Sequence, residues 1–494
     1  MEEFDFLVIG SGSGLDVANV AANRGQSVAI VEKGPLGGTC LNRGCIPSKQ
    51  LLYHADVYET IERADEFHID AEVEGVEFAE IVREVTEDVG ESSDSIRRGL
   101  RSSDQHRLFE GEGRFVDDHT IEISGGEDEG SPAQGAGEDD GTRVRAETIL
   151  IAAGTRPGVP PIDGIEDVDY LTSREALQLE TPPDRLTIVG GGYIAAELGH
   201  FFGTFGTDVT ILGRRPNLLP EADEEVAAAF TELYGERFAV QTGYAATGVH
   251  ESDSEITVEA MPYEYDDDGE SGRVVDGGEA LSVTADELLV AAGRVPNTDT
   301  LALENTAVET DADGFVETDE YLRTDAEGVW ALGDIVGEYL LKHSANHEAR
   351  AVMRNLFGDE PEPVDYSAMP FAVFGSPEVA GVGATEEALR AEGAEYATNT
   401  YRYDETARGK AMHAEGFVKA IIDLEGEILG CHIVGPDAST LIQEVVTAMT
   451  AGSGTVRDIR ESIHVHPALP EVVQRAFSGQ FTRGGDGGHD HHHH

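Results

Sequence analysis

Residues 4–32 are FDFLVIGSGSGLDVANVAANRGQSVAIVE, and this stretch decides the fold. Its first six residues are a short apolar run that ends at a glycine, which is typical of a buried parallel strand. The glycine turn of residues 10–14 leads into a helical stretch to about Arg24, and Ser27 to Glu32 form a second apolar run. This order of strand, glycine turn, helix and strand predicts a dinucleotide-binding βαβ unit at the start of the chain.

The turn itself predicts where a dinucleotide binds. Gly10 and Gly12 allow a pyrophosphate to approach the helix N-terminus, whose dipole favours an anion, and Gly14 belongs to the same turn. Glu32 ends the second strand, where a carboxylate can accept hydrogen bonds from both ribose hydroxyls. Leu15 stands where the fingerprint has its third glycine, so we expect the packing of helix on strand to adjust.

A second unit of this kind lies between Leu186 and Leu212, with the sequence LTIVGGGYIAAELGHFFGTFGTDVTIL. Gly190, Gly192 and Ala195 fit the pattern G-x-G-x-x-A. Two such units in one chain predict two nucleotides, or a dinucleotide cofactor together with a dinucleotide substrate.

The end of the second unit favours NADPH over NADH. No acid follows its last strand, and the sequence there is Gly213-Arg214-Arg215. An acid would repel a 2′-phosphate, whereas two guanidiniums can clamp one. The alternative is that these are two surface arginines in a loop.

Residues 37–49, GGTCLNRGCIPSK, carry the most specific chemistry. Cys40 and Cys45 can approach closely enough for a disulfide if the start of their helical stretch is distorted, and a helix N-terminus stabilises a thiolate. A metal site would need two more ligands nearby, and none is seen, so we expect redox chemistry and no metal. Cys431, in a strand-like segment far from the pair, is expected to be a small buried hydrophobe.

Near the C-terminus, residues 463–471 (IHVHPALPE) offer a base and a carboxylate. His466 could take and return a thiol proton while Glu471 orients its ring. A histidine in a loop bounded by proline can equally well be structural.

The composition limits the partners. The 494 residues contain 34 basic and 96 acidic side chains, a formal net charge of −62, which disfavours nucleic acid and anionic membranes as partners. No run of about 18 apolar residues could span a bilayer, and Met1-Glu2-Glu3 is not the basic start of a secretory signal, so we expect a cytoplasmic protein. We interpret the acid content as adaptation to a salty cytoplasm and expect activity to be lost at low salt.

Acidic, glycine-rich stretches at residues 124–141 and 264–278 predict solvated loops inserted into hairpins. From about Pro361 the pattern predicts a mixed α+β unit. The tail from Arg483 contains Gly, Asp and His and is expected to be disordered and not catalytic, whether it is a tag remnant or a native metal-binding tract.

Taken in order, these motifs resemble the glutathione reductase and dihydrolipoamide dehydrogenase family over nearly the whole chain. GGTCLNRGCIPSK resembles its redox-active disulfide segment, and residues 151–157 (IAAGTRP) and 290–297 (VAAGRVPN) resemble its two chain crossings. ALGDI at residues 331–335 resembles its second flavin motif, and HPALPE resembles its His-Pro-x-x-x-Glu.

The resemblance implies an α/β fold of two Rossmann-like dinucleotide-binding domains plus a C-terminal α+β dimerisation domain. Residues 1–160 and 286–360 would form the FAD-binding domain and residues 161–285 the NAD(P)H-binding domain. Residues 361–482 would form the dimer interface and residues 483–494 a disordered tail. The protein would be a homodimer in which each active site needs both chains.

The resemblance also assigns roles. Cys40 would attack the substrate disulfide, Cys45 would lie next to the flavin, Lys49 would pair with Glu197 near flavin N5, and the partner subunit's His466 would protonate the leaving thiol. The remaining residues expected to bind FAD or NADPH are Gly10, Gly12, Gly14, Glu32, Lys33, Gly38, Thr39, Gly154, Gly190, Gly192, Tyr193, Ile194, Arg214, Arg215, Gly293, Arg294 and Asp334, the last through the ribityl chain.

Residues 339–350, 439–449 and 466–477 resemble the mycothione reductase branch most, and Leu15 also fits that branch. Because salt-adapted archaea are expected to use γ-glutamylcysteine, the expected reaction is NADPH-dependent reduction of bis-γ-glutamylcystine. The alternative is an NAD-dependent dihydrolipoamide dehydrogenase of 2-oxoacid dehydrogenase complexes, against which Arg214 and Arg215 argue. Mercuric reductase is disfavoured because no cysteine pair lies at the C-terminus. A non-catalytic flavin scaffold is disfavoured because the four residues of the redox site are intact: Cys40, Cys45, His466 and Glu471.

Overall fold

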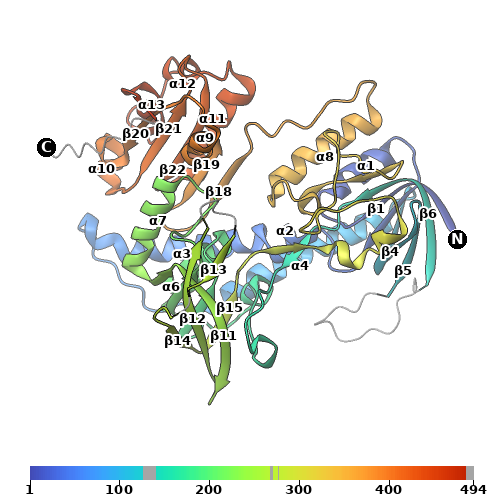
Figure 1. Ribbon diagram of the computed structural model, residues 1–494, viewed down its shortest axis with the longest axis horizontal. Coiled ribbons are helices and arrows are strands. Elements are labelled where there is room, and N and C mark those ends of the chain that lie inside the picture. The colour runs from blue at the N-terminus through green and yellow to red at the C-terminus, as the bar shows by residue number, and fades with distance from the viewer. Residues whose placement is uncertain (126–140, 267–270, 276, 485–494) are drawn as a thin grey trace.

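The computed structural model describes residues 1–125, 141–266, 271–275 and 277–484. The N-terminal sheet and the C-terminal sheet lie toward opposite ends of the long axis, with a second parallel sheet between and below them (Figure 1). Most of the predicted loop at 124–141 and of the predicted tail, residues 126–140 and 485–494, lies outside the described residues.

The first sheet grows from β1 (Glu2–Ile9), which pairs in parallel with a strand on each side. Its order is β3-β2-β1-β6-β5-β4, with β17 beside the last residues of β6. The strands that join β1 are β2 (Val28–Glu32), β3 (His106–Glu110), β4 (Glu112–Asp117), β5 (Thr120–Ser124), β6 (Thr142–Ile151) and β17 (Val329–Ala331).

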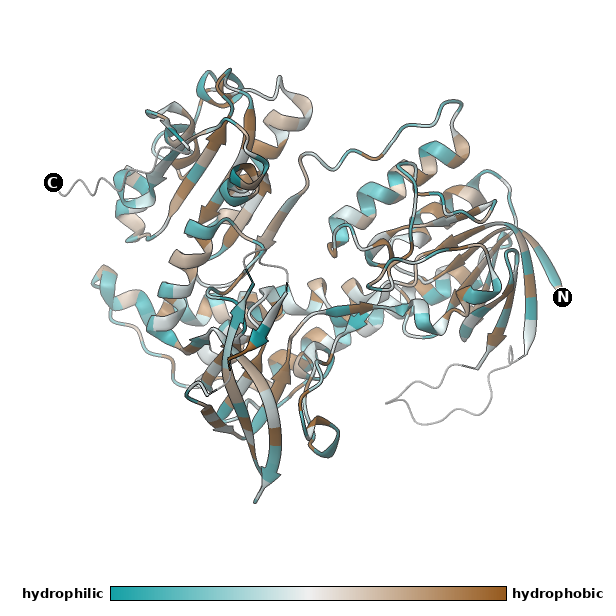
Figure 2. Ribbon diagram, viewed as in Figure 1, coloured by the Kyte–Doolittle hydropathy of each residue, from teal (hydrophilic) through white to brown (hydrophobic). Residues whose placement is uncertain are grey.

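Both faces of β1 are covered, which explains why its sequence is an unbroken apolar run rather than an alternating one. Phe6 and Val8 are buried against the helices α1 (Gly14–Asn23) and α8 (Lys342–Phe357). Leu7 and Ile9 face the other way and are buried against β4 and β5. Figure 2 shows that the strands of this sheet carry much of the hydrophobic colour, whereas the surrounding helices have hydrophilic faces.

The second parallel sheet, in the order β10-β9-β8-β15, is the second predicted unit. The helices α6 (Tyr193–Thr204) and α7 (Glu224–Arg237) connect its strands. Its strands are β8 (Arg185–Val189), β9 (Asp208–Gly213), β10 (Ala239–Thr242) and β15 (Glu287–Val290).

An antiparallel sheet extends from this unit, built from β11 (Tyr244–Ser252), β12 (Glu255–Tyr265), β13 (Gly272–Val274) and β14 (Leu281–Ala285). The prediction that residues 264–278 are a solvated loop is therefore wrong for residues 264–265 and 272–274, which belong to β12 and β13. Tyr265 pairs with Gly272, because the alternating side chains of β12 continue to Tyr265 before the chain turns.

The two predicted chain crossings lie side by side. β7 (Thr155–Pro157) pairs antiparallel with β16 (Arg294–Pro296), so the chain leaves the first unit and returns to it through adjacent extended segments. This pairing places the residues around Gly154 next to those around Gly293.

The C-terminal unit is an antiparallel sheet covered by α11 (Ala438–Ala451) and α13 (Pro470–Ser478). Cys431 lies in β22 and is fully buried, as predicted. Arg483 ends a short edge strand, so the predicted start of the disordered tail is wrong by at least one residue. The sheet runs β18 (Pro370–Val373), β19 (Val379–Gly383), β22 (Ile428–Val434), β21 (Phe417–Ile422), β20 (Ala397–Arg402) and β23 (Thr482–Arg483).

Helices α2 (Gly38–Arg43), α3 (Cys45–Glu62) and α4 (Phe78–Arg101) link the units, because α3 packs on both α4 and α6.

The sheets and helices of the three units together confirm the predicted α/β class with a mixed C-terminal unit. The shorter helices are α5 (Ser173–Ala176), α9 (Glu386–Glu392), α10 (Ala407–Met412) and α12 (Val456–Arg460), and the 3₁₀ turns are Arg63–Phe67, Ile165–Asp167, Asn297–Thr300, Leu303–Asn305, Gly333–Val336 and Tyr403–Glu405.

Candidate functional site

The two cysteines lie on either side of a break between two helices. Cys40 is within α2, and Cys45 is the first residue of α3. Gly44 joins the helices, and a Cβ at this position would lie 2.9 Å from the carbonyl oxygen of Thr39, so only glycine allows the chain to fold back this tightly. The distortion that the sequence required is thus a full interruption, and it brings the two sulfurs into hydrogen-bond contact.

Sequence reasoning missed the side chain that supports this bend. The amide nitrogen of Asn42 donates to the carbonyl oxygens of Leu36 (2.9 Å) and Gly38 (2.9 Å), and lies 3.3 Å from that of Pro35. An asparagine between the two cysteines was the available signal, because a side-chain amide can satisfy loop carbonyls that a helix cannot.

The two thiols differ in acidity. The hydrogen bond from Cys40 lowers the pKa of Cys45 to about 6, with a further contribution from the Lys49 ammonium, although burial and Glu197 act in the opposite direction. The same bond, with burial, raises the pKa of Cys40. Of the two thiols, Cys45 therefore forms the thiolate, at the N-terminus of an 18-residue helix whose dipole also favours the anion.

Lys49 and Glu197 meet one helical turn beyond Cys45. The ammonium of Lys49 donates to both carboxylate oxygens of Glu197, at 2.8 and 2.7 Å, and lies 4.8 Å from the centre of the Phe374 ring. Glu197 is buried and also accepts a hydrogen bond from the backbone N–H of Phe374 (3.1 Å). Elements from all three units thus hold one ion pair; Phe374 was not predicted and carries no sequence signal.

The first glycine turn leaves a backbone cradle that side chains would fill. Gly10 has φ +99°, and a Cβ there would lie 2.2 Å from the carbonyl oxygen of Ala152. Gly38, with φ +70°, comes so close to Gly12 that a Cβ would lie 2.8 Å from its Cα. A Cβ on Gly12 would meet no atom within 4 Å, and such an open backbone at a helix N-terminus fits the pyrophosphate of a dinucleotide such as FAD.

Gly14 carries the helix–strand packing that the sequence analysis expected to adjust. A Cβ on Gly14 would lie 2.7 Å from a methyl group of Val8 and 2.8 Å from Cβ of Ala152. Leu15 is instead buried in the adjoining hydrophobic cluster. The close contact between α1 and β1 is therefore kept, but the glycine that allows it is Gly14, one position before Leu15.

Glu32 lies at the end of β2 beside this cradle. Its carboxylate accepts from the backbone N–H (2.8 Å) and hydroxyl (2.7 Å) of Ser11 and from the N–H of Gly34 (2.8 Å). These bonds orient a carboxylate at the position where a ribose would bind. Lys33, in contrast, forms an ion pair with Glu112 at the surface (3.3 Å).

Asp334 is brought to the paired chain crossings. Its carboxylate accepts from the hydroxyl of Thr155 (2.8 Å), and that hydroxyl in turn accepts from Arg294 (2.7 Å), which lies 3.8 Å from Asp334. These contacts join predicted residues of both crossings in one polar cluster. Gly154 and Gly293, which precede Thr155 and Arg294, have positive φ values of 63° and 128°.

The second glycine turn is also tight. Gly190 has φ +140°, and a Cβ there would lie 2.1 Å from the carbonyl oxygen of Ala291, whereas a Cβ on Gly192 would meet no atom within 4 Å. Tyr193 begins α6 and is partly exposed, and desolvation of its hydroxyl raises its pKa to about 12. Ile194 packs against the hydrophobic core beneath the turn.

A large cavity lies beside the two cysteines and the ion pair of Lys49 with Glu197. Its volume is about 1760 Å³, and it lies between α3, the start of α6, the start of α8, β18 and α11. Of the predicted catalytic residues it contains Cys40, Cys45, Lys49 and Glu197. The start of α8 contributes Lys342, which donates to the hydroxyl of Ser13 (2.6 Å) and so places a cation near the first glycine turn.

His466 and Glu471 are paired but lie away from this cavity in the same chain. Nδ1 of His466 is 3.0 Å from a carboxylate oxygen of Glu471, and this hydrogen bond lowers the pKa of Glu471. The imidazole is 74% exposed, on a loop where Ile463 and Val465 also project outward.

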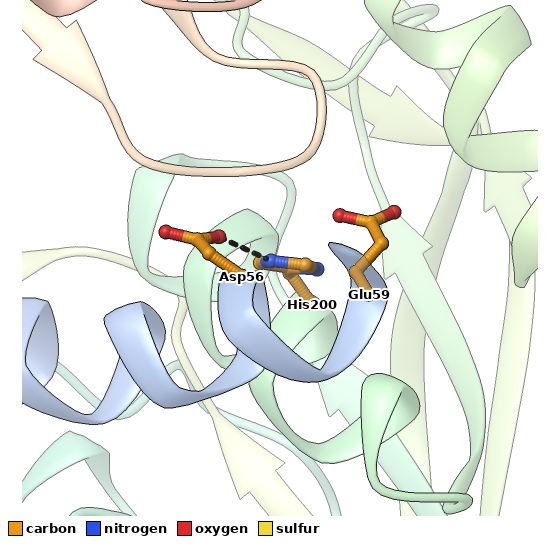
Figure 3. A group of neighbouring side chains, drawn as sticks. All are labelled: Asp56, Glu59 and His200. Carbon is orange, nitrogen blue, oxygen red and sulfur yellow. Dashed lines mark hydrogen bonds and ion pairs between the residues drawn. The ribbon is translucent and has the colours of Figure 1, made fainter. Parts of the chain in front are cut away.

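Asp56, Glu59 and His200 form a further cluster between α3 and α6 (Figure 3), with potential ligand atoms within 4.8 Å of one another. The guanidinium of Arg237 donates to Nδ1 of His200 (3.2 Å) and lies 3.6 Å from Glu59, while Nε2 of His200 faces Asp56 (3.3 Å). Because a guanidinium only donates, Nδ1 of His200 must accept, and the ring proton is then on Nε2, which faces Asp56. The cluster is thus a hydrogen-bonded contact that connects α3, α6 and α7.

No helix among the described residues is long and apolar enough to span a membrane.

Known protein families match almost the whole chain. Residues 4–351 match the model of pyridine nucleotide-disulphide oxidoreductases, and residues 369–477 match the dimerisation domain of that family. The second match indicates that the protein is a homodimer.

Individual proteins agree with this. The chain is 36% identical to a mycothione reductase from Mycobacterium tuberculosis, over 97% of this chain and 100% of the relative. It is also 36% identical to dihydrolipoyl dehydrogenase 3 from Haloarcula marismortui, over 96% of this chain and 95% of that one. Among solved structures, the Cu(II) complex of the HOCl-induced flavoprotein disulfide reductase RclA from Escherichia coli superimposes with a TM-score of 0.81 at 26% identity, over 97% of this chain and 99% of that chain.

The relatives match nearly the full length of this chain. The structure adds a cysteine pair at a helix break and two glycine turns, and both kinds of evidence lead to the same conclusion. The chain belongs to the pyridine nucleotide-disulphide oxidoreductases and is a flavoprotein enzyme of this family, dependent on FAD and a pyridine nucleotide.

Proposed function

We propose that this enzyme uses NADPH to reduce a low-molecular-weight disulfide, bis-γ-glutamylcystine or a mycothione-like compound. The observation that carries the choice of coenzyme is the end of β9, where Gly213 is followed by Arg214 and Arg215 and by no carboxylate. A guanidinium pair at this point attracts a 2′-phosphate, which an acid would repel.

We assign residues 1–160 and 286–360 to the binding of FAD, 161–285 to NADPH and 361–482 to the dimer interface. The glycine cradle at Gly10 and Gly12, the carboxylate of Glu32 and the cluster at Asp334 would hold the flavin. Bound there, FAD supplies a two-electron relay from the nicotinamide to the cysteine disulfide.

In the reductive cycle, the electron pair first opens the disulfide between Cys40 and Cys45. The Cys40 sulfur then attacks one sulfur of the substrate, the substrate S–S bond breaks, and the first thiol leaves with a proton from the partner subunit's His466. The thiolate of Cys45 next attacks Cys40, which restores the enzyme disulfide, and the second thiol leaves with the proton that Cys40 gave up to the partner subunit's His466. One NADPH and one proton thus yield NADP⁺ and two thiols.

Lys49 and Glu197 support the first half of this cycle. The ammonium of Lys49 lowers the pKa of Cys45 and keeps a positive charge beside the reacting sulfur, while the buried Glu197 fixes its position. Lys342 acts on the other sulfur, because its charge favours the thiolate of Cys40 against the effects of Cys45 and burial.

The homodimer would share its active sites. Exposure of the His466 imidazole, far from the cysteines of its own chain, supports a role in the neighbouring subunit. Glu471 would hold the ring in place through the hydrogen bond at Nδ1.

Dihydrolipoamide dehydrogenase is the second candidate, since relatives of that name from Haloarcula marismortui and Haloferax volcanii are each 36% identical to this chain. The deciding experiment measures NADPH oxidation with bis-γ-glutamylcystine in about 1 M KCl, beside the same assay with NADH and beside NAD reduction by dihydrolipoamide. We expect rapid turnover with NADPH only. No turnover there, together with rapid NAD reduction by dihydrolipoamide, would overturn the proposal.

A further inference from the structure

The arginine pair after β9 is attached to a neighbouring strand through its backbone. The N–H of Gly243 donates to the carbonyl oxygen of Arg215 (3.1 Å), and the carbonyl oxygen of Gly243 accepts from the N–H of Tyr263 (2.8 Å). Two backbone hydrogen bonds therefore fix the end of β12 relative to the arginines.

Two aromatic rings of β12 face these arginines. Tyr263 and Tyr265 are two positions apart, so their side chains project from the same face of the strand. Their ring centres are 5.1 Å apart, and the guanidinium carbon of Arg215 lies 3.7 Å from the centre of the Tyr265 ring. The guanidinium of Arg214 lies over Tyr263 at 5.6 Å.

The opposite strand makes room for these rings. Gly272 of β13 pairs with Tyr265, and a Cβ at this position would lie 2.6 Å from an atom of the Tyr263 ring. The absence of a side chain at Gly272 is what lets Tyr263 lie over the sheet toward Arg214.

We propose that Tyr263 and Tyr265 are positioning residues that hold Arg214 and Arg215 for the 2′-phosphate of NADPH, and so set the preference for this coenzyme. The inference rests on the proposed use of NADPH. Stacking occupies the face of a guanidinium and leaves its in-plane N–H groups to bind a phosphate.

The large negative charge of the molecule bears on the stacking of the two arginines on the two tyrosines. With 96 acidic and 34 basic side chains, carboxylates compete with the phosphate of the coenzyme for every guanidinium. A ring under each guanidinium restricts its orientation without using its in-plane N–H groups.

The test compares Tyr265→Ala, Tyr263→Ala and Tyr265→Phe in the full-length enzyme. We expect each alanine variant to raise KM for NADPH about 3- to 10-fold and to weaken binding of 2′,5′-ADP by a similar factor, as for the loss of one cation–π contact. The values of kcat and of KM for NADH should not change, and Tyr265→Phe should retain NADPH affinity because it keeps the ring.

A matched control is Tyr321→Ala, which removes an equivalent stack over Arg323 (4.6 Å) outside the second unit. The inference is overturned if the alanine variants raise KM for NADPH and NADH equally, or if 2′,5′-ADP binds as before. A double Arg214→Ala, Arg215→Ala variant separates this failure from that of the proposed function. If it leaves the ratio of NADPH to NADH activity unchanged, the choice of coenzyme itself is wrong.

Discussion

At the scale of single residues, the reactivity of the site depends on how one proton is shared between two sulfurs. Cys45 accepts a hydrogen bond from Cys40, which lowers the pKa of Cys45 to about 6. The thiolate of Cys45 therefore exists above about pH 6 and is lost as the pH falls through this value. An ordinary thiol, with a pKa of about 8.5, would still be protonated at neutral pH.

Removing the donor should reverse this shift. In the reduced Cys40→Ala protein we expect the pKa of Cys45 to rise by about one unit or more toward the ordinary value. Titration of the thiolate ultraviolet absorbance measures it. Cys431→Ala is the control, because burial raises the pKa of Cys431 and keeps it out of the titration. If the pKa of Cys45 stays near 6 in Cys40→Ala, the lowered pKa is caused by Lys49 and the N-terminus of α3 rather than by Cys40.

At the scale of elements, the contact between α1 and β1 depends on the missing side chain of Gly14. Gly14→Ala places a Cβ 2.7 Å from Val8, which should destabilise the protein by about 1–3 kcal/mol and reduce its flavin content. Chemical denaturation and the ratio of flavin to protein absorbance measure the two effects. Gly90→Ala in α4 is the control, since its Cβ meets no atom within 4 Å and should stabilise the helix by up to about 1 kcal/mol. Equal stability of both variants would contradict the packing argument.

The same elements show how far the sequence predicts the structure. The runs 4–9 and 27–32 predict strands because both faces of a parallel sheet are apolar, and the described strands β1 and β2 confirm them with ends that differ by one or two residues. The interruption at Gly44 depends on the carbonyl of Thr39 and on the amide of Asn42, and neither contact leaves a periodic pattern. Local patterns therefore predict the elements, whereas the break that joins the two sulfurs is a tertiary contact.

The candidate site shows the same limit over longer distances. Lys49 and Glu197 are 148 positions apart and meet because α3 packs on α6, which no spacing rule predicts; family resemblance paired them. The β12–β13 pairing was missed because Glu264 to Gly278 is acidic and glycine-rich, and composition conceals the register of Tyr265 with Gly272.

At the scale of the whole molecule, a buried ion cluster joins the second unit to the C-terminal unit. Lys419 on β21 is 1% exposed and lies 2.9 Å from Asp223, 3.1 Å from Glu225 and 2.7 Å from Glu386. Asp223 is itself fully buried and caps the start of α7. The cluster fixes the unit that closes one side of the cavity.

Lys419→Met would leave Asp223 buried without its cation. We expect a loss of about 3–5 kcal/mol in the free energy of unfolding, measured by denaturant titration. Lys410→Met is the matched control at an exposed position and should cost less than about 0.5 kcal/mol. If the two variants unfolded at the same denaturant concentration, the cluster would not hold the units together.

The net charge of −62 makes the molecule repel itself. The Debye length, over which this repulsion acts, is about 3 Å in 1 M salt and about 10 Å in 0.1 M salt, so the repulsion reaches further at the lower concentration. We expect activity and Tm to fall together as KCl is lowered from about 1 M to 0.1 M. Steady-state rates and thermal unfolding at a series of KCl concentrations measure this. Full activity and an unchanged Tm at the low concentration would contradict adaptation to salt.

The exposed loop of His466 has a consequence for subunit mixing. A Cys45→Ser homodimer and a His466→Gln homodimer should each be almost inactive. If the sites are shared as proposed, a mixed dimer would unite the intact cysteines of one chain with the intact histidine of the other at one of its two sites. Unfolding and refolding the two proteins together should therefore create activity that neither has alone, and its failure to appear would place His466 outside the partner's site. Two defective genes could then complement each other in one cell. Whether the cell has the activity would depend on the combination of the two alleles and not on either allele alone.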